Sequence, residues 1–386
     1  MPRSLPIAAA ALAAAAGACV ETLPPLDETT SLRVELLSPV DPGTREARLD
    51  DTVRTAQIRV TAIDAQGQVD TDFQFATQVY VQFLGTLTPE LGRNMPLATV
   101  ALTDGVSAPT TIELPPVFGP TVLWVEDGGP EGSYATGTSS TLWFRDPYIA
   151  DIQTPADEEA IDALSASPLE LKQVNVSASR HGDRGRLVVN GTYAQGYTVS
   201  DVACADAAGT PPCVAGPYDH LLIFSFSRPK DEHGRNIVTG QVIDGFAGGV
   251  QEFNGLTEIG FPQSFVDGEP VVDEARIPEP VVVQPSWLST EKIQFERNEA
   301  GLIAVDGATV CPLDDDYATY KQWKLDLGNG CRNAVNVITA GVVADFDPGA
   351  HVGRTLPRVV GVLRPLSIEN FNVWILYPRA GSDLSL

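Results

Sequence analysis

The chain is poor in basic side chains and in histidine. Its 386 residues contain 25 Lys and Arg against 50 Asp and Glu, which gives a formal net charge of −25 at pH 7. Proteins that read nucleic acid neutralise phosphates with Lys and Arg, so this balance argues against a nucleic-acid partner. The four histidines, His181, His220, His233 and His351, lack the close spacing typical of zinc ligands.

Sequence motifs of common enzyme classes are also missing. The chain has no Gly-x-Ser-x-Gly nucleophile elbow and no phosphate-binding Gly-x-x-x-x-Gly-Lys-Ser/Thr loop. Asp219-His220 beside Tyr218, and Asp231-Glu232-His233, contain candidate acid/base pairs of adjacent residues. Neighbouring residues of a strand point to opposite faces, which argues against convergence of such a pair. We therefore expect a non-catalytic protein with no cofactor and no catalytic metal.

No apolar run is long enough to span a bilayer, and the longest one, at residues 5–16, has the length of a secretory signal. It ends in Ala16-Gly17-Ala18-Cys19, which resembles the lipobox of bacterial lipoproteins, although that family usually has a bulky apolar residue in place of Ala16. The resemblance implies a signal peptide over residues 1–19, lipid on Cys19 and a membrane tether over residues 20–30. Val20, where Asp would imply inner-membrane retention, favours the outer membrane or cell surface. Ordinary signal cleavage beside an incidental cysteine is the alternative.

Cysteine is scarce, and its positions form a pattern. Apart from Cys19, the four cysteines form two close pairs, Cys204 with Cys213 and Cys311 with Cys331. An even number of paired cysteines predicts local disulfides in an exported chain. Four cysteines allow three connectivities, and a zinc site made of four thiolates is the rival, but no Cys-x-x-Cys spacing supports it.

Short strand-like runs dominate residues 187–265. The runs are rich in β-branched and aromatic residues and are bounded by Gly, Pro, Asp or Asn. Within residues 221–227, Leu222, Phe224 and Phe226 alternate with serines, which predicts a half-buried strand. Asn254-Gly255 predicts a two-residue hairpin turn between the last two strands.

Glycines within these runs favour a closed barrel. Gly191 and Gly240 fall inside predicted strands, where a missing side chain marks a bulge or a sharp bend. The order of residues 187–193, 197–199, 238–242 and 252–259 resembles the OB-fold modules found beside extracellular nucleases and in bacterial surface proteins. The resemblance implies an OB-like Greek-key barrel over residues 171–270.

A predicted OB-like barrel does not by itself identify the class of ligand. Such barrels hold single-stranded nucleic acid, carbohydrate or protein, or serve only as spacers. Residues 171–280 contain eight basic against fourteen acidic side chains, so nucleic acid is disfavoured here as well. Tyr193, Tyr197 and Tyr218 are candidate ligand contacts if they lie on an exposed face, and core residues otherwise.

Residues 31–150 show a second all-β pattern. Residues 56–63 and 77–83 alternate apolar and polar side chains, and further strands are expected at 98–102, 110–114, 121–126 and 140–144. About seven short strands in this length predict a β-sandwich. Residues 60–67, Gly105 and Trp143-Phe144 resemble bacterial immunoglobulin-like domains, here without a cross-sheet disulfide.

The remaining segments complete the domain plan. Residues 151–170 are an acidic linker or a short helix between Pro155 and Pro168. Residues 271–386 are expected to be a second, divergent OB-like barrel, because residues 359–363 and 371–372 echo 238–242 and 253–254. Residues 302–307 also align with 187–191, and 323–327 with 221–226. Chance agreement between short β motifs is the alternative.

Two charged clusters are weaker candidates for sites. Asp314-Asp315-Asp316 offers oxygen ligands for calcium but lacks the spaced pattern of a calcium loop, so a solvated loop is favoured. Arg180, Arg184 and Arg186 form a local basic patch or a solvated turn. The sequence therefore predicts an all-β, lipid-anchored envelope or surface protein that binds a protein or glycan. An accessory subunit of an extracellular nuclease or hydrolase is the alternative.

Overall fold

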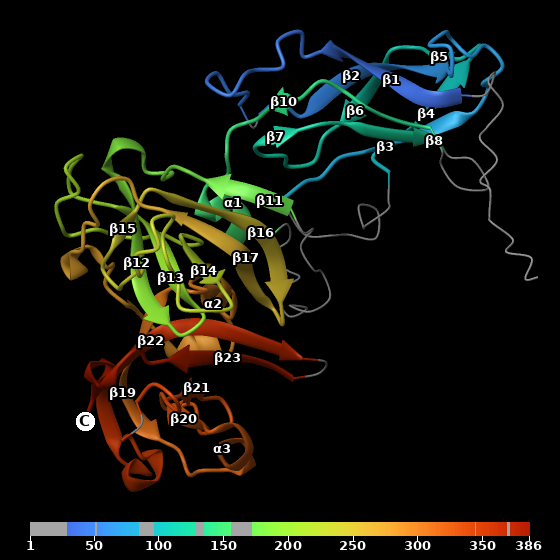
Figure 1. Cartoon of the computed structure of the whole chain (residues 1–386). Helices are drawn as coiled ribbons and strands as arrows, with labels where there is room; N and C mark the ends of the chain where they lie inside the picture. Colours follow the sequence, from blue (N-terminus) through green and yellow to red (C-terminus); the bar gives the residue numbers. More distant parts are fainter. Residues whose placement is uncertain are drawn as a thin grey trace, which may run out of the picture.

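The computed structural model describes residues 29–50, 52–84, 96–127, 135–155, 172–343, 345–368 and 371–386. Three β modules follow one another along the chain, coloured blue to cyan, green to yellow and orange to red in Figure 1. The predicted fold class, all-β with an immunoglobulin-like sandwich followed by OB-like barrels, is confirmed. The predicted signal peptide with Cys19, most of the tether and most of the acidic linker lie outside the described residues.

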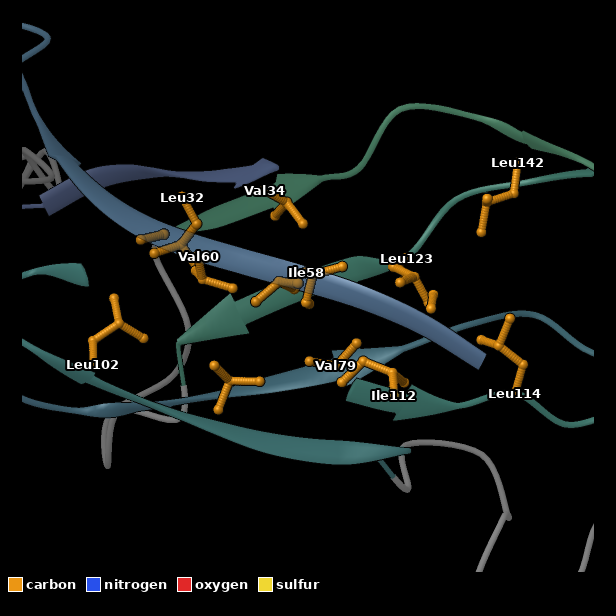
Figure 2. Close-up of a cluster of buried hydrophobic side chains, with 14 of the residues drawn as sticks. Leu32, Val34, Ile58, Val60, Val79, Leu102, Ile112, Leu114, Leu123 and Leu142 are labelled. Atoms are coloured by element: carbon orange, nitrogen blue, oxygen red, sulfur yellow. The ribbon is translucent and has the colours of Figure 1, made fainter. Parts of the chain in front are cut away.

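The first module is a sheet that folds over itself into a sandwich. Its strand order is β1-β2-β5-β4-β3-β8-β9, with β6 paired to β2, and β9 comes back against β1. Along β2, Ile58, Val60 and Ala62 are buried while the residues between them are half-exposed, as the alternation predicts. Figure 2 shows Ile58 and Val60 pointing toward Val79 and other residues of the facing layer.

The strands of the sandwich are β1 (Thr29–Ser38), β2 (Thr55–Asp64), β3 (Ala76–Tyr80), β4 (Ala98–Thr103), β5 (Val106–Ser107), β6 (Thr110–Glu113), β7 (Pro120–Thr121), β8 (Trp124–Asp127), β9 (Thr136–Thr138) and β10 (Leu142–Trp143). β1 begins at Thr29, so the last two residues assigned to the tether belong to the sandwich. β7 and β10 form a separate pair.

The second module is a closed barrel. β12, β13 and β14 pair antiparallel, β14 pairs parallel with β17, β17 pairs antiparallel with β16, and β15 just before β16 pairs with β12. This circuit, with one parallel pair closing the barrel, is the OB-like arrangement. Its elements are α1 (Ile149–Gln153), β11 (Lys172–Val176), β12 (Gly185–Tyr193), β13 (Gly196–Ala203), β14 (His220–Phe224), β15 (Val242–Ile243), β16 (Gly245–Phe253) and β17 (Leu256–Phe265).

Two of the three turn and bulge predictions for this barrel are confirmed. Asn254 and Gly255 have φ values of 53° and 79°, and Phe253 pairs with Leu256, so they form the two-residue hairpin turn. The β12–β13 register shifts between Val189 and Gly191, which is a bulge. Gly240, with a φ of 80°, marks a sharp bend, but its predicted place inside a strand was wrong, because it lies in a turn before β15.

The side-chain alternation predicted for β14 was also wrong. Leu221 and Ile223 point into the barrel core, and Leu222 is buried as well, in a separate cluster with Ala300 of the next module. Phe226 lies beyond the strand and is 68% exposed. The predicted alternation requires one face of the strand to be exposed to solvent, whereas the third module covers the outer face of β14.

The third module repeats the same circuit. β19, β20 and β21 pair antiparallel, β21 pairs parallel with β23, and β22 pairs antiparallel with both β23 and β19. The shared order supports the predicted repeat. Trp323, however, lies on the second strand of its barrel, so its alignment with the third strand of the first barrel was wrong.

The elements of the second barrel are β18 (Val281–Val282), the 3-10 helix η4 (Pro285–Leu288), α2 (Ile293–Arg297), β19 (Leu302–Val310), α3 (Asp315–Tyr320), β20 (Gln322–Asp326), β21 (Val335–Ile338), β22 (Thr355–Ile368), β23 (Phe371–Tyr377) and β24 (Leu384–Ser385). Other single turns of 3-10 helix are η2 (Gly182–Arg184), η3 (Glu274–Arg276), η5 (Pro348–His351) and η6 (Gly381–Asp383).

Two disulfides link the predicted cysteine pairs. Cys204 is bonded to Cys213 and Cys311 to Cys331, which rules out a zinc site made of four free thiolates. Such bonds indicate an oxidising, exported compartment. In the part of the chain that the structure describes, no helix is long and apolar enough to cross a membrane.

Candidate functional site

The second barrel carries a hollow with a volume of about 440 Å³. Three parts of the chain build it: η4 with α2, the start of β21, and β23. The size lies within the range of small-molecule sites. The lining residues are Trp287, Leu288, Lys292, Phe295, Ala334, Val335, Asn336, Asn372, Val373 and Trp374.

Three aromatic rings form one wall of the hollow. Phe295 and Trp374 stack nearly parallel, with ring centroids 5.8 Å apart and an interplanar angle of 17°. Trp287 meets Phe295 edge to face at 5.5 Å. Trp287 and Phe295 are also part of the barrel core, which fixes their orientation although α2 is only five residues long. The wall is therefore rigid, and Trp374 is its half-exposed ring.

The polar groups of the hollow differ in how they are held. Asn336 is fixed, because its Nδ2 donates to the Trp374 carbonyl at 3.1 Å and its Oδ1 accepts from Gln322 at 3.0 Å. Lys292 and Asn372 are exposed and line the mouth. Lys292 is the one charged residue of the lining, and no lining residue is acidic. An aromatic face with amides beside it suits a ligand that has both apolar ring faces and hydroxyl groups.

The tyrosines predicted as ligand contacts do not form this site. Tyr197 is fully buried in the first barrel, and its hydroxyl lies 2.7 Å from Ser264 Oγ, so that prediction was wrong. Tyr193 is covered by the Arg364 guanidinium, 4.3 Å above its ring, and is a contact between the barrels. Tyr218 is half-buried in the loop before β14 and remains a prediction.

One group in the described part of the chain has the spacing of metal ligands. Donor atoms of His181, Asp201 and Asp219 lie within 4.8 Å of one another. Arg180 already supplies a cation there, with Nε 2.7 Å and Nη2 2.9 Å from the two carboxylate oxygens of Asp219. Asp201 accepts from the Arg180 amide at 2.9 Å and from the Ser179 hydroxyl. These contacts anchor the loop before β12, so we assign the group a structural role.

A buried serine and histidine pair is sealed from solvent. Ser200 Oγ lies 2.7 Å from His220 Nδ1 and accepts from Asn190 Nδ2 at 2.7 Å. Burial lowers the pKa of His220 to about 4, so the ring is neutral. Gly301 of the second barrel covers the ring. Asp219 is bonded to Arg180 instead, so Asp219 and His220 diverge as the sequence predicts.

The charged clusters noted in the sequence are engaged within the fold. Lys324 Nζ lies 2.6 Å from Asp314 and 2.8 Å from Asp316, and Asp314 caps α3. Residues 314–316, which were expected to form a solvated loop, therefore begin the short helix α3. Lys324 neutralises part of their negative charge. In the predicted basic patch, Arg180 pairs with Asp219, and Arg186 donates to backbone carbonyls.

The sequence did not predict the hollow, because the residues that line it come from segments far apart in the chain. The rings of Trp287 and Trp374 come from opposite ends of the barrel sequence. One signal was available: three of the five tryptophans, Trp287, Trp323 and Trp374, lie in the last module.

No protein-family model, no curated protein and no solved structure matches the chain.

Proposed function

We propose that the protein is a non-catalytic binding module, exported and held to a bacterial membrane by lipid on Cys19. Its ligand site is the hollow of the second barrel. The observation that carries this proposal is the stack of Trp374 on Phe295 at the edge of that hollow, beside the exposed Lys292 and Asn372. The lipobox-like Ala16-Gly17-Ala18-Cys19 supports the anchor, and Val20 favours the outer membrane or cell surface.

The ligand class that fits best is a neutral glycan. The face of an indole ring packs against the apolar C–H face of a sugar, while amides bond its hydroxyl groups. A net charge of −25 disfavours polyanions. A protein partner commonly covers about 800 Å² on each side, a far larger surface than this hollow offers. OB-like barrels are known to hold oligosaccharides.

The alternative function, an accessory subunit of an extracellular nuclease or hydrolase, is supported by no specific contact among the described residues. A basic or aromatic groove on the first barrel would favour it. The hollow lies instead on the second barrel, and its lining contains one lysine.

The test is a binding measurement with the chain that begins at Val20. Neutral oligosaccharides from the envelope are titrated by calorimetry against this protein and its variants. Trp374→Ala should weaken binding roughly tenfold or more, because a lost aromatic contact costs about 1.5 kcal/mol. Asn372→Ala, at an exposed position, should weaken binding without changing the fold.

A matched control separates the hollow from general effects of losing an aromatic ring. Trp124, on the sandwich, is 44% exposed and packs against Tyr80. Trp124→Ala should leave glycan affinity unchanged. Equal affinity of the Trp374→Ala and unaltered proteins for every bound glycan would contradict the site. If an envelope protein binds the unaltered protein and the Trp374→Ala variant equally well, the ligand-binding surface lies outside the hollow.

A further inference from the structure

The two barrels meet across a group of three carboxyl groups, of which Glu296 and Glu299 are buried and Glu252 is half-buried. The first barrel contributes Glu252 from β16 and the second contributes Glu296 and Glu299, within and just after α2. Glu299 is 2% exposed and accepts a hydrogen bond from the Thr257 amide of β17 at 2.9 Å. Figure 1 shows α2 beside the strands of the first barrel. This carboxyl group therefore lies at the contact that joins the barrels.

These carboxyl groups have few partners. Glu296 Oε2 and Glu299 Oε2 are buried without a hydrogen-bond partner in the described chain. Glu252 Oε2 accepts from the Thr257 hydroxyl at 2.8 Å, and the Gln153 side chain nearby donates to the His220 carbonyl at 2.6 Å. Among the described residues, none of the three glutamates forms an ion pair with Lys or Arg. Charged carboxylates at this contact would repel one another without an ion-pair partner among the described residues, so the arrangement favours the protonated forms.

The electrostatics follow from this burial. Loss of solvent, and then the Glu258 carboxyl, raise the pKa of Glu252 to about 7. Loss of solvent, and then the Glu252 carboxyl, raise the pKa of Glu296 to about 8. The same causes raise the pKa of Glu299 well above its usual range. These groups therefore carry protons at acidic pH and lose them in the neutral to alkaline range.

The other charged and titratable groups of the interface do not neutralise the three glutamates. Arg364 of β22 lies between the rings of Tyr193 and Tyr377, at 4.3 and 5.2 Å, and its charge acts on Glu258. His220 of β14 is neutral because burial lowers its pKa. Arg364 thus acts on Glu258, and Arg379, which also reaches across the contact, donates to the Asn190 carbonyl at 2.8 Å and pairs with Asp383. Among the described residues neither arginine forms an ion pair with the three glutamates.

We propose that Glu252, Glu296 and Glu299 form a proton-controlled clamp, which holds the two barrels together when protonated and loosens their contact when it ionises. The carboxyls ionise more readily once water reaches them, so opening is favoured as pH rises through their raised pKa values. The stabilisation is fully present below about pH 4.5 and declines through about pH 7 to 8. Phe295 and Glu296 are neighbours on α2, so the clamp and the hollow share one short helix.

Hydrogen exchange of the whole exported chain tests the clamp. Protection of the Thr257 and Tyr218 amides, which both donate across the barrel contact, is compared at about pH 5.5 and pH 8.5 after correction for the intrinsic exchange rate. Protection should fall as pH rises above about 4.5, by up to roughly tenfold per pH unit for each glutamate that ionises on opening, and the contributions of Glu252 and Glu296 should level off above about pH 7 and pH 8. The Val189 amide, bonded within the first barrel, should keep its protection and serves as the internal reference.

The decisive variant is Glu252→Gln/Glu296→Gln/Glu299→Gln, which keeps the shape of the protonated side chains and cannot ionise. It should remain protected at alkaline pH. Unchanged protection in the unaltered protein, or an equal loss in this variant, would overturn the proposal. Restored protection with millimolar calcium would also overturn it, because the carboxylates would then be cation ligands. If the triple variant folds poorly, Glu252→Gln alone must reduce the loss of protection by roughly tenfold, and an undiminished loss counts against the clamp.

Discussion

Gly301 of the second barrel lies directly against the imidazole ring of His220 in the first. A Cβ atom on Gly301 would lie 2.5 Å from His220 Cδ2 and 2.7 Å from Nε2. The ring has no room to retreat, because Nδ1 is 2.7 Å from Ser200 Oγ in a fully buried network. The contact between the barrels therefore depends on a missing side chain.

Gly301→Ala is expected to destabilise the protein by about 1–3 kcal/mol, the usual cost of overfilling a packed interior. The free energy of unfolding is measured with denaturant for both proteins. Gly381→Ala is the control, because the nearest atom to a Cβ there is the Val343 Cγ1 at 3.9 Å. Equal effects of the two substitutions would show that the barrels do not meet as described.

Lys172→Met is expected to stabilise the protein near neutral pH. Lys172 is 4% exposed, and its Nζ bonds the Gln82 carbonyl at 3.1 Å. Burial lowers its pKa from 10.5 to about 8, so charged Lys172 costs the folded state about 3 kcal/mol below that pH. Loss of the Gln82 bond offsets about 1 kcal/mol of the gain.

The pH dependence distinguishes this cause from better packing. Between about pH 8 and 10.5 the unfolded chain holds the lysine proton while the folded chain has lost it, so the unaltered protein gains stability with pH. The advantage of Lys172→Met should shrink over that range in denaturant titrations. A variant that is less stable at neutral pH would contradict the expectation.

Mild reduction is expected to open the two disulfides in a fixed order. Cys331 is exposed, whereas Cys204, Cys213 and Cys311 are at most 3% exposed. An attacking thiolate needs access to a sulfur atom, so the Cys311–Cys331 bond should be reduced first. Alkylation followed by mass measurement reads the order, and no thiol should label before reductant is added. Earlier labelling of Cys204 would be inconsistent with its burial.

Cys19→Ala tests the membrane anchor. If Cys19 carries lipid, this substitution should move the protein from the detergent phase to the aqueous phase in a phase-partition assay, because the acyl chains supply the membrane affinity. Ser4→Ala is a control within the leader and should not change the partition. Unchanged partitioning of Cys19→Ala would refute the anchor.

Local signals in the sequence determined much of the architecture. Alternation along β2, the Asn254-Gly255 turn and the close cysteine pairs each depend on residues near in the chain, so they could be predicted without tertiary contacts. The missed features depend on distant segments. Burial of both faces of β14 requires the second barrel, which a pattern within one strand does not reveal.

The sequence by itself determined an exported, acidic, all-β chain with paired cysteines, because composition and short-range periodicity encode these properties. Only the tertiary structure decided which side chains meet. It buried Tyr197, placed Trp374 on Phe295 and brought Glu252 to Glu296 of α2. The physical reason is that ring stacking and carboxyl pKa values depend on two quantities, the distance between side chains and their exposure to solvent. For segments far apart in the chain, both quantities are set by closure of the barrels and by their docking on each other.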